Sequence, residues 1–121
     1  MKFVEMMKLM HVYLNHFPKH EQNGLNLVIK KTAYDVFKLI VEGQKAYYKK
    51  TTLTNLDKEH EKLRMLIWLA YELKYFNYKD GKNSKKNLEA KRYSAISHLV
   101  DELGKMIGGW IKKIKEQNQW K

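Results

Sequence analysis

The sequence predicts an all-α fold, an antiparallel up-down-up-down four-helix bundle. Apolar residues recur at spacings of three and four along most of the 121-residue chain, which is the pattern of amphipathic helices. One proline and six glycines are few, whereas strand-rich domains need more turn residues. The connections between the helical stretches are short, as between antiparallel neighbours. We therefore expect residues 1–121 to form a single four-helix-bundle domain.

Four segments carry the helical pattern, and we expect helices at roughly 2–15, 20–49, 54–78 and 87–116. The first stops before Phe17–Pro18, because the residue before a proline disfavours helical geometry. The second begins after the proline. We expect the tail after Lys115 to fray.

Turn signals separate the later helices. Thr51–Thr52 marks the break before the third helix, where Thr54 offers an N-cap three residues before Asp57. The lysine-rich segment 79–86 is the clearest loop, with the turn-forming pair Asp80–Gly81 near its start. With no strands predicted, a glycine-rich phosphate loop following a strand is not expected.

The formal net charge is +11, from 24 Lys and Arg against 13 Asp and Glu. Such an excess costs a compact domain self-repulsion and usually indicates a polyanionic partner, either nucleic acid or another acidic partner. The alternative is that the lysines only keep the protein soluble, and composition does not separate the two.

The rest of the composition bears on the compartment. The chain has no cysteine, so disulfides and thiolate sites are excluded, which suits a reducing cytoplasm. No apolar run approaches the ~18 residues of a spanning helix, and the first residues lack a signal-peptide pattern. We expect a soluble cytoplasmic protein with no membrane partner.

Alternating helix direction would sort the basic residues into two ends of the bundle. One end would gather Lys19, Lys79, Lys82, Lys85 and Lys86, and the other Lys2, Lys45, Lys49, Lys50, Lys112, Lys113 and Lys115. Within the second group, Lys49, Lys50, Lys112 and Lys113 are candidate nucleic-acid or partner-binding residues. For any single lysine, a solvated helix end is the simpler interpretation.

Aromatic residues lie among these charges. Tyr47–Tyr48 precedes Lys49–Lys50, and a second group (Tyr71, Tyr75, Phe76 and Tyr78) surrounds Lys74. Such rings could stack on bases. They could equally line a core or a subunit interface.

The sequence argues against an enzyme. His16 and His20 would share a helical face, but Pro18 interrupts the helix and no third metal ligand is evident. Neither an activated nucleophile nor the Glu-x-x-His pairs of di-iron bundles occur. We expect no catalytic residues, no metal and no cofactor.

The last helix carries an unusual group of glycines. Gly104, Gly108 and Gly109 lie inside an otherwise good helix next to Trp110, although each glycine costs about 1 kcal/mol relative to alanine. Such residues usually let another backbone or a bulky ring come close. A contact within the chain or between subunits would explain them.

Over residues 13–114 the sequence resembles the accessory variability determinant proteins of diversity-generating retroelements. These are relatives of the four-helix-bundle proteins encoded in intervening sequences of ribosomal RNA genes. The resemblance rests on ordered segments: Phe17-Pro18-Lys19, Leu25 with Ile29-Lys30-Lys31, Ile40-Val41-Glu42-Gly43, Leu63-Arg64, Leu69-Ala70-Tyr71-Glu72-Leu73-Lys74 and Gly104-Lys105-Met106-Ile107-Gly108-Gly109-Trp110. The last segment favours the retroelement branch.

The resemblance implies a ring-shaped homopentamer of four-helix bundles that binds the reverse transcriptase of its own element. It also implies binding to RNA, DNA or an RNA–DNA hybrid, in support of mutagenic template copying (retrohoming). The family's basic positions correspond to Lys30, Lys31, Arg64 and Lys74, which could instead form internal salt bridges. The alternative function is a structural or protein-interaction bundle of the ribosomal intervening-sequence type, with no reverse-transcriptase partner.

Overall fold

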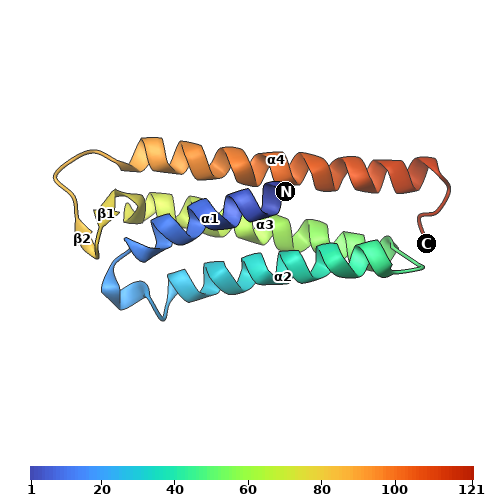
Figure 1. Ribbon diagram of the computed structural model, residues 1–121, viewed down its shortest axis with the longest axis horizontal. Helices are drawn as coiled ribbons and strands as arrows, with labels where there is room; N and C mark the ends of the chain where they lie inside the picture. The colour runs from blue at the N-terminus through green and yellow to red at the C-terminus, as the bar shows by residue number, and fades with distance from the viewer.

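The computed structural model describes residues 1–121 and is mostly helical, as the apolar periodicity predicts. Four α-helices lie side by side along the long axis of the molecule (Figure 1). Their bounds are α1 (Lys2–Asn15), α2 (Leu25–Lys45), α3 (Lys50–Glu72) and α4 (Glu89–Glu116). The shorter elements are the 3-10 turns η1 (Lys19–Glu21) and η2 (Tyr75–Asn77) and the strands β1 (Tyr78–Lys79) and β2 (Lys82–Asn83). The two strands, which the sequence did not predict, pair antiparallel.

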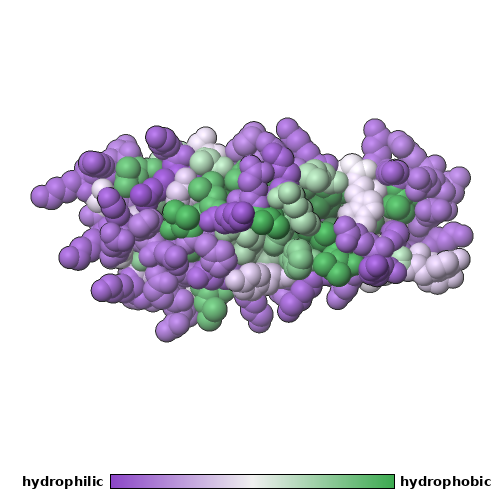
Figure 2. Space-filling model, in the orientation of Figure 1, coloured by the Kyte–Doolittle hydropathy of each residue, from purple (hydrophilic) through white to green (hydrophobic).

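The buried face of each helix follows the apolar spacing of its sequence. On α3, Leu53, Leu56 and Leu63 are fully buried, and on α1 Met6 and Met10 fill the same hydrophobic core. Burying a side chain of this size contributes roughly 1.5–3 kcal/mol. Hydrophilic side chains dominate the surface of Figure 2, and a strip of hydrophobic ones lies between α2 and α4. No helix combines the length and the hydropathy that crossing a bilayer requires.

The first helix is much shorter than the others. At 1.5 Å per residue, the 14 residues of α1 span about 21 Å and the 28 residues of α4 about 42 Å. The N-terminus therefore lies midway along the molecule (Figure 1). Lys2 consequently does not join the other lysines of its expected group at the end of the bundle. Its Nζ lies 2.7 Å from Oε2 of Glu102, in the middle of α4.

The second helix is shorter than the predicted range 20–49. Residues after Pro18 form only the 3-10 turn η1, and Gly24, with φ −111° and ψ −116°, separates that turn from α2. At the other end Ala46 is extended, with φ −66° and ψ 135°, so the helix stops at Lys45. Periodicity alone missed both limits, because the apolar spacing continues beyond them.

The third helix lies several residues earlier than the predicted range 54–78. Thr51 and Thr52 are helical, and no side chain caps the start at Lys50, so the predicted Thr54 cap is wrong. The helix ends because Lys74 adopts the left-handed conformation, with φ 64° and ψ 21°. The fourth helix begins at Glu89, two residues later than predicted.

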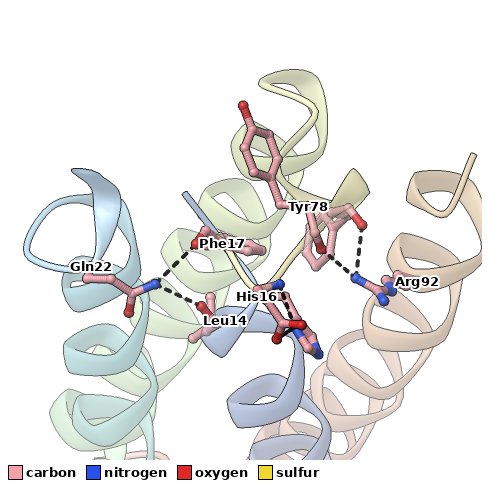
Figure 3. A network of polar contacts seen from close by, with 8 residues as sticks. Leu14, His16, Phe17, Gln22, Tyr78 and Arg92 are labelled. Carbon is pink, nitrogen blue, oxygen red and sulfur yellow. Dashed lines mark hydrogen bonds and ion pairs between the residues drawn. The ribbon is translucent and has the colours of Figure 1, made fainter. Parts of the chain in front are cut away.

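The predicted turn at Asp80–Gly81 joins the two short strands. Both residues have positive φ, 53° and 80°, as a two-residue type I′ hairpin requires. The hairpin is tied to the end of α1, since the Gly81 N–H donates to the His16 carbonyl at 3.1 Å and the Asp80 N–H donates to His16 Nδ1 at 3.1 Å. Figure 3 shows the neighbouring contact in which Arg92 of α4 donates to the Tyr78 carbonyl at 2.8 Å.

The C-terminal tail does not fray as expected. After α4, Asn118 adopts a left-handed conformation and the Gln119 N–H returns to the Ile114 carbonyl, as in a Schellman helix end. The chain then turns back, and the Lys50 N–H donates to the Lys121 carbonyl at 2.9 Å. The tail thereby closes over the turn between α2 and α3.

Candidate nucleic-acid interface

Exposed lysines gather at the two ends of the molecule. We call the end that carries β1 and β2 the hairpin end, and the end at residues 46–49, where the C-terminus also lies, the turn end (Figure 1). The exposed lysines of the hairpin end are Lys19, Lys79, Lys82, Lys85 and Lys86. Those of the turn end are Lys45, Lys50, Lys112, Lys113, Lys115 and Lys121. Clusters of one sign raise the local concentration of a polyanion.

Lys49 and Lys50 are adjacent but differ in what their side chains do. The half-buried Lys49 donates from Nζ to the Gly43 carbonyl at 2.5 Å and to the Ala46 carbonyl at 2.9 Å. These oxygens belong to the end of α2, where helical carbonyls lack partners. The side chain of Lys50 is exposed and makes no ion pair or hydrogen bond. Lys49 is therefore a helix-capping residue by its contacts, and Lys50 is a free cation.

The four basic positions that the resemblance implies lie in the half of the molecule nearer the hairpin end. Lys30 is half-buried and Lys31 exposed, and neither has a carboxylate within 4.0 Å. Arg64 forms a two-bond pair with Glu61, one turn earlier on α3. That hydrogen-bonded pair raises the pKa of Arg64 and lowers the pKa of Glu61. Lys74 lies 3.8 Å from a carboxylate oxygen of Glu89.

The glycines of α4 fall into two classes. A Cβ on Gly104 would lie 2.5 Å from Cε1 of His60, so Gly104 is where α3 and α4 come close. His60 is buried there and donates from Nε2 to the Val100 carbonyl at 2.7 Å. Gly108 and Gly109 have open space beside them. Only Gly104 serves a close contact within the chain.

Trp110 packs within the chain against a glycine that the sequence did not single out for this role. A Cβ on Gly43 of α2 would lie 2.7 Å from Cη2 of the Trp110 ring. Trp110 is half-buried in this position. Gly43 is one of the buried residues of α2. The sequence did not indicate that a ring from α4 packs against it.

The two aromatic groups have different environments. Around Lys74 three of the four rings join the core: Phe76 is buried, Tyr75 packs against the core, and Tyr71 stacks on Tyr93 of α4 with centroids 4.2 Å apart. Burial raises the pKa of Tyr93. At the turn end, Tyr47 and Tyr48 are 88% and 66% exposed. The core interpretation is confirmed for Tyr71, Tyr75 and Phe76, whereas Tyr47 and Tyr48 lie outside the core.

Few His, Asp and Glu side chains have the arrangement that a metal site or a catalytic site requires. No three His, Asp or Glu side chains lie close enough together to hold a metal ion. His16 Nδ1 accepts the Asp80 N–H and lies 3.3 Å from a carboxylate oxygen of Asp80, and these contacts hold the hairpin against the end of α1.

Two apolar surfaces flank α2, one on each side. The α1–α2 face is lined by residues of α1, among them the exposed Val4, and by the exposed Tyr34 and Phe37 of α2. The α2–α3 face is lined by the exposed Val28, Met65, Trp68 and Leu69. Neither face was predicted from the sequence. The available signal was that Tyr34 and Phe37 fall outside the main apolar line of their helix.

The comparison with known families covers nearly the whole chain. The family model described as bAvd-like matches residues 1–114. Comparisons with curated proteins and with solved structures give no match. The matched range includes α1, α2, α3 and all but the last two residues of α4. The chain belongs to the bAvd-like family, a family of non-catalytic accessory proteins of diversity-generating retroelements.

Proposed function

We propose that this protein binds nucleic acid and the reverse transcriptase of its own retroelement, and so supports mutagenic template copying without catalysing it. One observation carries the proposal. A bAvd-like chain with a formal net charge of +11 presents its lysines exposed at both ends. A surface of this kind suits a polyanion that is bound through its phosphates, independently of its base sequence.

The nucleic-acid contacts are contacts to phosphate. Lys31, Lys50, Lys112 and Lys113 are exposed and have no carboxylate within 4.0 Å, so their charges are available. Lys30 adds a half-buried cation. RNA, DNA and an RNA–DNA hybrid all present the same phosphates, and binding is therefore largely independent of sequence.

Arg64 and Lys74 contribute by exchanging partners. Their carboxylate partners are Glu61 and Glu89, and both cations are substantially exposed. Exposed ion pairs contribute only about 0.2–1 kcal/mol, so a phosphate can replace the carboxylate at little cost. Lys49 keeps its capping bonds and adds its charge to the turn end.

The assembly that we propose is a homopentameric ring of antiparallel up-down-up-down bundles, each folding as one domain over residues 1–121. A closed ring needs two different complementary surfaces on every subunit. The α1–α2 face and the α2–α3 face, on opposite sides of α2, are suited to that role. A ring would multiply weak phosphate contacts into useful avidity.

The proposal is tested by absolute mass in solution, with and without a short RNA–DNA hybrid, followed by a salt titration. We expect a mass of about five chains that increases on adding hybrid at low salt. Engagement of 6–10 phosphates would lower the affinity by about 10³–10⁵ between 50 and 200 mM salt. The triple variant Lys50→Ala, Lys112→Ala, Lys113→Ala should give a shallower salt slope.

Other outcomes would contradict parts of the proposal. Absence of binding to RNA, DNA or hybrid at low ionic strength would remove the nucleic-acid function. An oligomer that binds neither nucleic acid nor the element's reverse transcriptase in a pull-down would instead fit a structural bundle of the ribosomal intervening-sequence type.

A further inference from the structure

The turn between α2 and α3 displays two tyrosine side chains that the fold does not bury. Tyr47 is 88% exposed and Tyr48 66%, whereas the other exposed aromatic side chains, Tyr34, Trp68 and Phe37, lie between 40% and 47%. A ring this exposed adds little to the hydrophobic core. It is a large apolar surface held in water, surrounded by lysines.

The geometry of the pair leaves ring faces free. The centroids of Tyr47 and Tyr48 are 4.8 Å apart and their planes meet at 87°, an edge-to-face arrangement. The edge of one ring covers one face of the other, and the remaining faces are open to solvent. Flat π-surfaces of this kind are the platforms on which unpaired bases stack.

The turn that carries the rings is held from both sides. Lys49 bonds the carbonyls of Gly43 and Ala46, which fixes the end of α2. The Lys50 N–H donates to the Lys121 carbonyl, which fixes the start of α3 to the tail. A ligand that binds such a turn spends little free energy on ordering it.

A polar hollow of about 490 Å³ adjoins the rings, within the size range of small-ligand sites. It is lined by Ala46, Tyr47, Tyr48, Lys49, Asn118, Gln119 and Lys121. The side-chain amides of Asn118 and Gln119 make no hydrogen bond within the chain, so their donors and acceptors are free. No Asp or Glu side chain lines the hollow, and the exposed Lys121 places a cation at its edge.

We propose that this turn is a stacking site for an unpaired base of single-stranded RNA or DNA. Tyr47 and Tyr48 supply the ring faces, the amides of Asn118 and Gln119 meet the edge of the base, and Lys50 and Lys121 hold the flanking phosphates. The inference rests on the proposed nucleic-acid function and adds to it a preference for unpaired strands. The bases of a duplex are already stacked on one another and gain nothing from these rings.

The test compares a fluorescently labelled oligothymidylate with a blunt-ended duplex of equal length at one salt concentration. The variant Tyr47→Ala, Tyr48→Ala should lose single-strand affinity by roughly tenfold or more, because stacking contributes about one to two orders of magnitude per base. Its affinity for the duplex should stay within twofold of the unaltered protein. The matched variant Tyr47→Phe, Tyr48→Phe keeps the rings and should bind both ligands normally.

Folding is controlled by thermal unfolding, which should be unchanged because both rings are exposed. A 2-aminopurine base within the single strand should lose fluorescence on binding the unaltered protein and not on binding the double alanine variant. Equal affinity of the alanine variant and the unaltered protein for the single strand would overturn the stacking site and leave the proposed function standing. If the unaltered protein binds neither ligand, the proposed function fails and the stacking site fails with it.

Discussion

At the scale of single residues, neighbours in the sequence have different tasks. Lys49 caps a helix while Lys50 is exposed, and Gly104 fits against a ring while Gly108 faces open space. These differences come from the contacts each position makes across the fold. They allow paired substitutions in which one member controls for the other.

Replacing Lys49 should lower the stability of the protein more than replacing Lys50. Lys49→Met keeps the length of the side chain but removes the bonds to two carbonyls at the end of α2. We expect the free energy of unfolding, measured in urea, to fall by about 1–2 kcal/mol. Lys50→Met is the control and should stay within about 0.5 kcal/mol. The opposite ranking would show that the capping bonds contribute nothing.

Replacing Gly104 should destabilise the protein although alanine is the better helix former. The new Cβ would lie 2.5 Å from the ring of His60, which is buried and hydrogen-bonded. Overpacking typically costs about 1–3 kcal/mol, more than the roughly 1 kcal/mol gained in helix propensity. Gly108→Ala, with open space beside it, should be neutral or stabilising. Thermal unfolding of both variants measures the difference, and equal stabilisation would contradict the close contact.

At the scale of elements, polar contacts join segments that the hydrophobic core packs together. The hairpin is fastened to α1 through His16 and to α4 through Arg92. The short first helix is joined to α4 by Lys2 and Glu102. Since α1 spans only half of α4, this ion pair anchors its free end.

That ion pair gives a pH dependence of known sign. The hydrogen bond and charge of Lys2 lower the pKa of Glu102, and those of Glu102 raise the pKa of Lys2. A lowered carboxyl pKa stabilises the fold above about pH 4, and that stability is lost as the pH falls. A raised lysine pKa stabilises the fold at pH values below the ordinary lysine pKa. That stability is lost as the pH rises through the alkaline range.

The variant Glu102→Gln tests the acid side of this pH dependence. Its free energy of unfolding should vary less between pH 5 and pH 3 than that of the unaltered protein, as read from urea titrations. Glu116→Gln removes an exposed carboxylate that makes no ion pair and should keep the original pH dependence. A Glu102→Gln curve parallel to the original would show that the pair does not couple to folding.

At the scale of the whole molecule, the two apolar faces make the ring hypothesis testable. If each contact joins the α1–α2 face of one subunit to the α2–α3 face of the next, Phe37→Glu and Val28→Glu should each give monomers. Both side chains are exposed in the subunit, at 40% and 48%, so either variant should fold. Light scattering measures the masses.

Mixing the two variants sharpens the result. Each retains the face that the other has lost, so an equimolar mixture should form dimers and nothing larger. If only one variant dissociates, the subunits pair like face to like face, and the ring of heterologous contacts is wrong. Lys31→Glu, on the same helix, controls for added negative charge.

Much of the fold could be predicted because helical periodicity is local. Spacings of three and four identify all four α-helices, the bounds of α1 match, and the Asp80–Gly81 pair predicts its turn. Helix ends were harder to predict, because the apolar spacing continues beyond them. The left-handed backbone of Lys74 ends α3, and the Lys49 side chain caps the end of α2, and neither feature belongs to the periodicity.

Composition and spacing alone identify a basic, helical, cysteine-free chain that carries the segments of the bAvd-like family. Net charge is a sum over residues and periodicity is a spacing along the chain, so both can be read without coordinates. The folded chain was needed to show which tyrosines join the core and which are exposed, which lysine is a cap, and which glycine lies against His60. The reason is physical, since exposure and partnership are properties of what the rest of the chain places beside a residue.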